Sequence, residues 1–385
     1  MLKESRIYPF SQIAANITSR VEPSDTELDR YVGLEHLDPE SLKLRRWGSP
    51  ADVIGQKLRF WKGDIIYGKR RAYQRKLAVA DFDGICSAHA MVLRAKPDVC
   101  LPEFLPFFLQ SDLFHQRAME ISVGSLSPTI NWGTLAVQEF PLPPVDEQRR
   151  IADLLWAADD AIVEYQNVLS KLENLELSLV AKHTQPKDDW QKKQIKEFAD
   201  VAYGLTVDSF RRNLKTEKPY LRVANVWRNS FDFSEIKNIG ADDGDEKRYC
   251  LLVNDVLVVE GHANVEEIGR AALWEGQIEG CLHQNHILRI RIRNDKEIKP
   301  KFLLTFINSP IGKNYMKSRA KSTSGLNTIN STVLNTMEVS IPSYEVQEEI
   351  MEMIGEVENA KAVTKAHLEN SFALKKQLLA SSLGG

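Results

Sequence analysis

Cysteine is scarce in this sequence and long apolar runs are absent, which excludes several classes of protein. The cysteines, Cys86, Cys100, Cys250 and Cys281, are scattered and form no Cys-x-x-Cys pair, so a disulfide framework is not expected. No run of about twenty apolar residues could form a transmembrane helix, and residues 1–5 do not resemble a signal peptide. We therefore expect a cytoplasmic protein.

Motifs for catalysis are also missing. The sequence contains no Gly-x-Gly-x-x-Gly and no Gly-x-x-x-x-Gly-Lys-Ser/Thr loop that could hold a nucleotide. It has no Asn-Pro-Pro-Tyr-like or Asp-Pro-Pro-Tyr-like segment of the kind that amino-methyltransferases place around a flipped base. Pro97-Asp98 is followed by Glu103 but lacks the lysine of a nuclease cluster. We predict a chain that recognises and does not catalyse, and that holds no cofactor or metal of its own.

Charge is unevenly divided along the chain. Residues 146–182 carry eight acidic and four basic side chains, and residues 343–385 carry seven and four. The rest of the chain therefore has a net charge of +4, although the whole chain has −3. This balance permits nucleic-acid binding by the globular parts, whereas the acidic segments are unsuited to lying on phosphates.

A stretch of some forty residues without Pro or Gly follows Pro144 and predicts a long helix. Apolar residues recur in it at alternating spacings of four and three: Ile151, Leu155, Ala158, Ile162, Tyr165, Leu169, Leu172 and Leu179. This is a heptad seam, which predicts packing against another long helix. Only Glu176 interrupts it.

A second run, from residue 343 onward, repeats the first at an offset of 199. The matched pairs are Pro143 with Pro342, Gln148 with Gln347 and Ile151 with Ile350. Its seam is poorer, because Lys361, Ser371 and Lys375 occupy seam positions. The repeat extends upstream, where 31–37, 63–67, 104–111 and 129–131 match 220–226, 254–258, 302–309 and 328–330. The chain therefore contains two copies of one unit, a globular domain followed by a long helix.

This arrangement resembles the specificity (S) subunit of Type I restriction-modification systems, the HsdS family. The resemblance covers essentially the whole chain, and its most specific parts are the entries into the two helices, 143–148 and 342–347. The second entry departs from the pattern at Val346, where the first has Glu147. The resemblance implies that each globular domain reads one half of a bipartite DNA target and that the helices set the spacing.

We predict an α+β fold with an internal pseudo-two-fold repeat. Two mixed, strand-rich target-recognition domains would be separated and joined by two long antiparallel coiled-coil helices. The predicted boundaries are 1–145 for the first domain, 146–183 for the central helix, 184–342 for the second domain and 343–385 for the C-terminal helix. Within the first domain, residues 85–94 are predicted to form one return strand.

A strongly basic loop is predicted between two strands of the first domain. Its candidate DNA-binding residues are Lys69, Arg70, Arg71, Tyr73, Gln74, Arg75 and Lys76. Arg and Lys can bind phosphates there, and Arg or Gln can pair with base edges. A solvated charged turn is the other interpretation, and the resemblance favours DNA contact. Ser125 and Ser127 are either further phosphate contacts or plain turn residues.

The second domain differs from the first at this place. Residues 261–270 follow the strand that matches the one before the basic loop, yet they are polar and weakly acidic. Different half-site preferences would follow. The candidate DNA-binding residues in the second domain are Arg211, Arg212, His262, Asn264, Gln284 and Asn285; side-chain amides can read adenine in the major groove.

Cys281, His283 and His286 could be mistaken for a zinc site. A structural zinc needs a fourth ligand at suitable spacing, and none is evident. His286 aligns with His89 at an offset of 197, which favours a repeated structural histidine. We predict no metal here.

The resemblance implies partners that carry the chemistry. Two methylation (M) subunits would bring S-adenosylmethionine, and two restriction (R) subunits would bring ATP- and Mg-dependent translocation and cleavage of double-stranded DNA. The candidate residues for docking the methylation subunits lie on the acidic helix: Asp153, Asp159, Asp160 and Glu164. They could equally form an ordinary solvated face. Two other functions remain open, the recognition subunit of another combined restriction-methylation enzyme and a non-DNA structural spacer with two binding heads.

Overall fold

The computed structural model describes residues 5–39, 41–323 and 325–383, apart from the side chains of Arg212 and Thr323.

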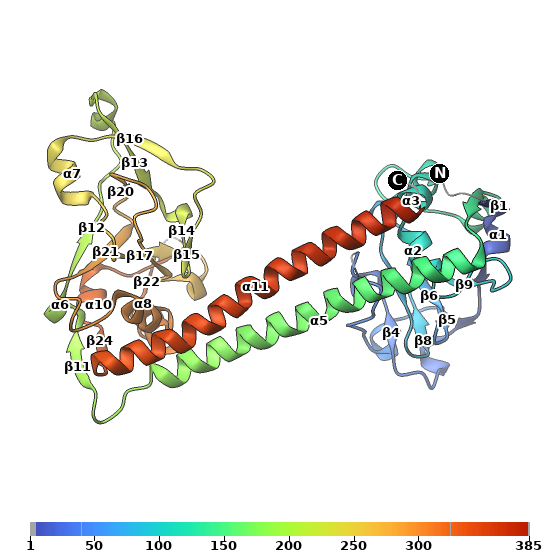
Figure 1. Cartoon of the computed structure of the whole chain (residues 1–385), viewed down its shortest axis with the longest axis horizontal. Helices are drawn as coiled ribbons and strands as arrows, with labels where there is room; N and C mark the ends of the chain where they lie inside the picture. Colours follow the sequence, from blue (N-terminus) through green and yellow to red (C-terminus); the bar gives the residue numbers. More distant parts are fainter. Residues whose placement is uncertain (1–4, 40, 324, 384–385) are drawn as a thin grey trace. The chain divides into compact units, whose positions relative to one another are not determined.

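The chain forms two compact units. Unit 1 consists of Met1–Leu169 together with Val363–Gly385, and unit 2 consists of Ser170–Ala362. Two long helices, α5 (Val145–His183) and α11 (Tyr344–Leu383), each contribute one part to each unit (Figure 1). The units therefore differ from the four consecutive segments predicted from the sequence, because the end of α11 returns to unit 1.

Unit 1 is built on two four-stranded sheets. The first has the order β2 (Ala14–Ile17), β9 (Ala90–Ala95), β6 (Ile65–Gly68), β7 (Leu77–Val79), and all its pairs are antiparallel. The second has the order β3 (Arg20–Val21), β5 (Lys57–Phe60), β8 (Gly84–Cys86), β4 (Tyr31–Val32), with β4 parallel to β8. A separate pair joins β1 (Arg6–Pro9) to β10 (Glu139–Leu142). Because β6 is held by β9 and β7, the loop between β6 and β7 starts from a fixed position.

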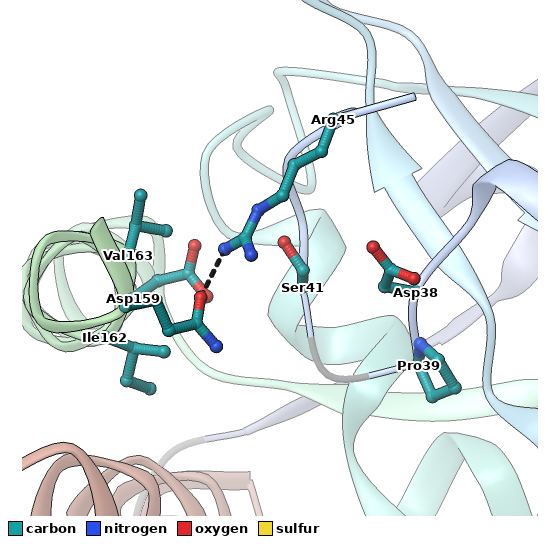
Figure 2. Close-up of a pocket in the computed structure, with 8 residues that line it drawn as sticks. Asp38, Pro39, Ser41, Arg45, Asp159, Ile162 and Val163 are labelled. Carbon is teal, nitrogen blue, oxygen red and sulfur yellow. Dashed lines mark hydrogen bonds between the residues drawn. The ribbon is translucent and has the colours of Figure 1, made fainter. Parts of the chain in front are cut away.

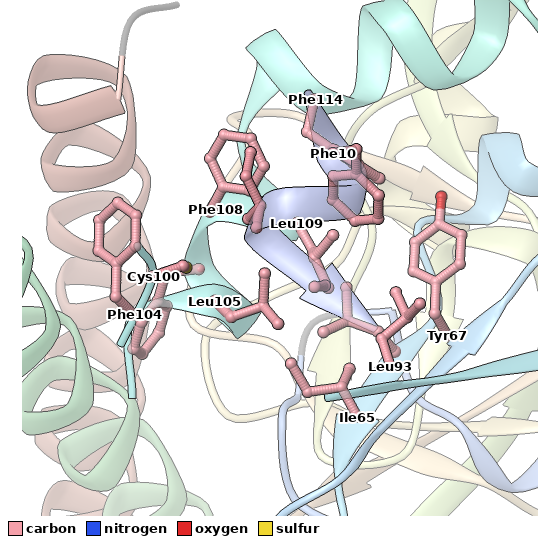
Figure 3. Packing of buried hydrophobic residues seen from close by; sticks show 14 of the residues in the cluster. Phe10, Ile65, Tyr67, Leu93, Cys100, Phe104, Leu105, Phe108, Leu109 and Phe114 are labelled. Carbon is pink, nitrogen blue, oxygen red and sulfur yellow. The ribbon is translucent and has the colours of Figure 1, made fainter. Parts of the chain in front are cut away.

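Helices cover the first sheet and enclose an aromatic core. They are α1 (Phe10–Ile13), α2 (Leu105–Gln110), α3 (Asp112–Glu120) and α4 (Trp132–Ala136). Figure 3 shows Phe10, Phe108 and Phe114 gathered beside Tyr67, and all four side chains are buried. Leu383 at the end of α11 belongs to the same core. The chain's last turn is thus part of what closes unit 1.

Unit 2 repeats this plan. Its four-stranded sheet has the order β12 (Ala199–Tyr203), β21 (Ile287–Ile292), β17 (Val256–Val259), β19 (Ala271–Leu273), and a three-stranded sheet has the order β16 (Lys237–Gly240), β13 (Glu217–Leu221), β20 (Leu282–His283). Two smaller sheets pair β11 (Gln191–Gln194) with β24 (Glu338–Ile341) and β14 (Val226–Trp227) with β15 (Ser230–Phe231). A third has the order β18 (Gly261–His262), β23 (Leu326–Thr328), β22 (Lys321–Thr323). Its helices are α6 (Ile195–Phe198), α7 (Asp243–Tyr249), α8 (Pro300–Asn308), α9 (Pro310–Arg319) and α10 (Ser331–Asn335). The predicted α+β fold with an internal repeat and two long helices is confirmed.

The single return strand predicted over residues 85–94 is wrong. Ala90 N–H donates to the carbonyl of Ser87 at 2.9 Å, which closes a turn in the middle of the run. The segment before the turn is β8 and the segment after it is β9, and they belong to different sheets. The polar residues Ser87 and His89 stand at this turn, and the exposed Ala88 lies between them, whereas the strands on either side are buried.

A buried aspartate anchors the equivalent turn in each unit. Asp64, which is buried, accepts two hydrogen bonds from the Arg94 guanidinium at 2.7 and 2.9 Å. Asp255, also buried, accepts two from Arg291 at 2.7 and 2.6 Å. Each aspartate also accepts a bond from the backbone N–H three residues before it. Bidentate arginine–carboxylate pairs fix both distance and orientation, so they hold β6 and β17 in matching places.

A buried glutamine ties each globular domain to the start of its long helix. The Gln148 amide donates to the carbonyls of Val99 and Pro143 at 2.8 and 3.0 Å, and its oxygen accepts from Leu101 N–H at 2.9 Å. Gln347 makes the same three bonds in unit 2, to Glu297, Pro342 and Lys299 at 3.1, 3.1 and 2.8 Å. These bonds explain why the Gln repeats at the two helix entries.

Polar pairs interrupt the apolar seam between the two long helices. In unit 1, Lys375 Nζ lies 2.6 Å from Asp159 Oδ1, and both side chains are buried. Tyr165 stacks on His367 nearby, so α5 and this part of α11 run in opposite directions. In unit 2, Glu176 pairs with Lys361. Two residues that break the predicted seams are thus partners of each other.

Neither α5, α11 nor any other helix within the described residues is both long and apolar enough to cross a bilayer.

Candidate nucleic-acid interface

The basic loop of unit 1 joins β6 to β7 and has an unusual backbone. Arg71 and Arg75 adopt left-handed conformations with φ of 57° and 50°. Between them, Ala72 is buried in the core and begins a single 3-10 turn. Such backbone conformations cost free energy in non-glycine residues. The buried Ala72 holds the loop in this shape and leaves its neighbours at the surface.

Three cationic side chains of this loop have no acidic partner among the described residues: Lys69, Arg70 and Arg71. Arg70 and Arg71 are exposed, and Arg70 Nη1 lies 3.3 Å from His89 Nε2. Burial lowers the pKa of Lys69, and the nearby charge of Arg20 lowers it further. Burial together with Arg70 and Lys69 also lowers the pKa of His89. Uncompensated positive charge of this kind attracts phosphate.

The other residues of the loop are used within unit 1. Arg75 forms an ion pair with Asp112 at 2.6 Å. Lys76 Nζ donates to the carbonyl of Leu34 at 2.9 Å. Gln74 is half-buried, whereas Tyr73 is 51% exposed. Some of the predicted DNA-binding side chains are therefore exposed to solvent, whereas others support the structure of the loop.

A small hairpin over residues 122–129 stands against the basic loop. Arg71 N–H donates to the carbonyl of Pro128 at 2.8 Å, and Ile130 N–H donates to the carbonyl of Lys69 at 3.0 Å. Ser125 is exposed, and the half-buried Ser127 accepts a bond from Thr129 Oγ1 through its carbonyl. Loop and hairpin therefore form one surface.

Unit 2 builds its equivalent surface from β18, β22 and β23. His262 lies on β18, and its Nδ1 accepts a bond from Asn264 N–H at 3.0 Å. Asn264 Oδ1 accepts from Glu266 N–H at 3.0 Å, which leaves its amide NH₂ directed elsewhere. A side chain at Gly261 would meet Thr328 Cγ2 at 2.8 Å, so glycine permits the close pairing with β23. β18 and the turn after it are polar where the loop of unit 1 is cationic, and β22 adds one exposed lysine, Lys321.

Arg211, which is predicted to bind DNA, is engaged within unit 2. Its guanidinium donates to both oxygens of Asp245 at 2.6 and 3.1 Å and to the carbonyls of Thr206 and Gly240 at 2.7 and 3.2 Å. The side chain is only 13% exposed, and the pair lowers the pKa of Asp245. Arg211 therefore supports the fold of unit 2. The side chain of Arg212 lies outside the described residues.

Gln284 and Asn285 follow β20 and are half-buried. Their backbones are fixed by bonds from Gln284 N–H to Leu221 and from Asn285 N–H to Leu205, both at 2.9 Å. No hydrogen bond of either side-chain amide is found within the described part of the chain. Both amides stay candidates for reading bases.

The residues weighed for zinc have other partners. His283 is buried, its Nδ1 lies 2.9 Å from the carbonyl of Tyr249, and burial lowers its pKa to about 4. His286 pairs with Glu260 at 2.7 Å, and burial raises the pKa of Cys281 to about 12. Within the described residues no cluster of three ligands suitable for a metal is found.

The acidic residues predicted to dock a partner do not all lie on one face. Asp153, Asp160 and Glu164 are exposed, and Asp160 pairs with Lys43 at 2.5 Å. Asp159 is buried and paired with Lys375, so its prediction as an outer-face residue is wrong. Its carboxylate lines a pocket of about 320 Å³ in unit 1.

That pocket lies between α5 and the loop that contains Ser41 and Arg45 (Figure 2). The Arg45 guanidinium donates to Gln166 Oε1 at 2.6 Å, which closes one side. The two acidic groups that line it have partners elsewhere, since Asp38 pairs with Arg46 at 2.5 Å and Asp159 with Lys375. We therefore interpret the pocket as a packing gap between α5 and this loop.

Comparisons with known proteins agree on one family. The family model described as the Type I restriction modification DNA specificity domain matches residues 53–174 and 187–371. The Type I restriction enzyme EcoKI specificity subunit of Escherichia coli (strain K12) is 21% identical over 365 residues, covering 91% of this chain and 76% of that protein. The StySPI specificity subunit of Salmonella potsdam is 22% identical over 377 residues, covering 91% and 77%.

Solved structures show the same fold. The Type-I restriction-modification system S subunit from M. genitalium matches with a TM-score of 0.60 and 14% identity, covering 99% of this chain and 96% of that chain. A chain from a structural study of complex assembly in the type I R-M system matches with a TM-score of 0.60 and 19% identity, covering 100% and 97%.

Proposed function

The chain belongs to the family of Type I restriction modification DNA specificity domains, and on this premise we propose that each of its units reads one half of a bipartite DNA target. The observation that carries the proposal is the combination of a repeated scaffold with unlike surfaces. Asp64 and Asp255 hold the same strand in each unit. The segment that follows this strand is cationic in unit 1 and polar in unit 2. Two domains that share a scaffold but differ in surface are suited to bind two different half-sites.

The long helices would set the distance between the two half-sites. α5 has 39 residues, which corresponds to a length of about 58 Å. This length equals roughly 17 base-pair steps of B-DNA. A target with several unread base pairs between its halves would follow.

Partner subunits would supply the chemistry. Two methylation subunits would bring S-adenosylmethionine and extrude the target adenine from the duplex, and two restriction subunits would bring ATP- and Mg-dependent cleavage. Exposed acids of α5 in unit 1, Asp153 and Glu164, are the side chains we propose for docking a methylation subunit. Asp160 would contribute less, because it already pairs with Lys43.

The test is modified-base sequencing of DNA from cells that express the chain together with a methylation subunit. We expect a methyladenine motif in two parts separated by an unread gap. The variant Arg70→Ala/Arg71→Ala should change or weaken one part only. Arg45→Ala, an arginine of the same unit outside the loop, serves as the matched control and should leave the motif unchanged.

The other functions predict different outcomes. An uninterrupted short motif would favour the recognition subunit of another combined restriction-methylation enzyme. No motif, with an assembled complex demonstrated by size-exclusion chromatography, would favour a structural spacer with two binding heads.

A further inference from the structure

An almost fully exposed leucine stands at the tip of the hairpin that backs the basic loop. Leu126 is 92% exposed, although turn positions usually carry polar residues or glycine. The hairpin around it is well fixed. Val123 and Thr129 exchange two backbone hydrogen bonds at 3.0 and 2.9 Å, and Gly124 has a φ of +106°. A rigid turn therefore presents an apolar side chain to its surroundings.

This leucine is attached to the cationic loop. Arg71 and Ala72 N–H groups both donate to the carbonyl of Pro128, at 2.8 and 3.3 Å, and Arg70 is bridged to Thr129. The positions of Arg70, Arg71 and Leu126 are thus fixed by one set of backbone bonds. Leu126 is two residues from Pro128 and therefore lies close along the hairpin to the backbone of the two arginines.

Unit 2 has a related hairpin, in which the exposed leucine is the first residue of a strand and not part of the turn. β22 and β23 form a hairpin whose turn contains Gly325, with a φ of +85°, and Leu326 is 50% exposed beside it. β23 pairs with β18, so His262 lies opposite Asn327. An exposed leucine therefore accompanies the candidate reading surface in both units, although the loops themselves differ.

We propose that Leu126 and Leu326 are wedges that insert into a base-pair step of the half-site read by their unit and unstack it. The inference rests on the proposed function. A duplex offers apolar surface mainly between its stacked bases, and proteins that bend DNA insert leucine or similar side chains there. Phosphates on either side would be held by Arg70 and Arg71 in unit 1. Opening a step beside the target would ease extrusion of the adenine by a methylation subunit, because unstacking is part of the cost of base flipping.

The experiment uses the chain assembled with its methylation subunit and duplexes that carry one 2-aminopurine at a time. The probe replaces, one at a time, each adenine on either strand of the unit-1 half-site and of its flanking base pairs except the methylated adenine, and its fluorescence rises when it is unstacked. We expect a several-fold rise at one step with the native chain and a return to background with Leu126→Ala. Leu126→Met should retain the rise. Leu326→Ala should act only on the other half-site.

Binding measurements separate a wedge from a loss of folding. Leu126→Ala should weaken binding by about tenfold with the slope of log affinity against log salt unchanged, since no phosphate contact is removed. Ile54→Ala is the matched control, because Ile54 is 93% exposed in the same unit but lies outside the hairpin. It should alter neither fluorescence nor affinity.

Two results would overturn the wedge while leaving the proposed function standing. In the first, the two-part methylation motif persists and no 2-aminopurine signal depends on Leu126. In the second, Leu126→Ala changes the preference for thymine at one position without any change in stacking, which indicates contact with a thymine methyl group in the groove. If the native complex methylates no defined sequence, the proposed function itself fails.

Discussion

The two units agree in their buried contacts and disagree at their surfaces. The Asp–Arg pair that holds β6 recurs at β17, and the glutamine that enters α5 recurs at α11 with the same three partners. Against this background, the basic loop of unit 1 has no cationic counterpart in β18 and the turn after it. The comparison separates residues that maintain the scaffold from residues free to specialise.

The units also differ inside, and two of these differences involve ionisable side chains. The position of Cys86 on β8 is taken by His283 on β20, since these residues lie opposite Val32 and Leu221 in equivalent parallel pairs. The ion pair between α5 and α11 is buried in unit 1, whereas Glu176 and Lys361 in unit 2 are 16% and 27% exposed. These differences allow the units to be distinguished by measurement.

The largest expected effect concerns the helix ion pairs. Lys375→Ala should lower the free energy of unfolding by about 3–5 kcal/mol, because it leaves the Asp159 carboxylate buried without a counter-charge. Lys361→Ala should cost about 1 kcal/mol or less, because its partner is partly solvated. Urea denaturation followed by tryptophan fluorescence measures both. The double variant Asp159→Leu/Lys375→Met should recover most of the loss, and equal losses at the two lysines would contradict the difference in burial.

The buried histidine should make unit 2 sensitive to acid. Burial lowers the pKa of His283 to about 4, below the value of about 6.5 in an unfolded chain. The unfolded state therefore binds the proton first, so the stability from this group is complete above pH 6.5 and is lost as the pH falls towards 4. The loss should reach roughly 2–3 kcal/mol by pH 4.5.

The effect can be measured from amide hydrogen exchange at several pH values, after correction for intrinsic exchange rates. The amides of β13 and β20 report on unit 2, and those of β4 and β8 report on unit 1. Unit 1 has Cys86 at the equivalent position, so its stability should lack this loss at acidic pH. His283→Cys, which copies unit 1, should flatten the pH dependence of unit 2. An unchanged slope in that variant would show that other groups cause it.

The repeated glutamines should behave alike. Gln148→Leu and Gln347→Leu each remove three hydrogen bonds and leave a backbone N–H, of Leu101 or of Lys299, without its acceptor. Each change should cost about 2–3 kcal/mol. Gln116→Leu, at an exposed position of α3 in unit 1, should change the unfolding free energy by less than about 0.5 kcal/mol. A large loss in one unit alone would mean that the two domains are attached to their helices differently.

The smallest effect should appear in DNA binding. Arg71→Ala should reduce the slope of log affinity against log salt by about 0.9, as expected for one phosphate contact. Asn264→Ala in unit 2 should leave the slope unchanged, because no charge is removed. Fluorescence anisotropy of labelled duplex with the assembled complex gives both slopes. Equal slopes for Arg71→Ala and the native chain would remove Arg71 from the interface.

Much of the fold could be predicted because the sequence shows a heptad spacing of apolar residues and an internal repeat. The heptad spacing indicated α5, and the proline–glutamine entries revealed the repeat. Asp159 could not be placed this way. α5 packs both on α11 and on the loop beside Arg45, so its buried face is wider than a two-position seam.

The basic composition of the site could be predicted from the sequence, but the roles of its individual residues could not. A run of basic residues marks the loop between β6 and β7, but nothing local shows which of them are free. Arg75 is taken by Asp112 and Arg211 by Asp245. Pairs between residues this far apart in the chain have no periodic signal. The sequence does not single out Leu126, because one apolar residue in a polar loop forms no periodic pattern.

The end of α11 has a consequence for how the molecule is made. Leu378, Leu379 and Leu383 pack into the core of unit 1, so the ribosome must synthesise all of unit 2 before unit 1 can be completed. At about 5–20 residues per second this delay is on the order of 10 s or more. During that interval the aromatic core of unit 1 lacks its closing helix, whereas unit 2 is continuous in sequence and can finish first. The domain that is translated second is therefore the one whose folding can be completed first.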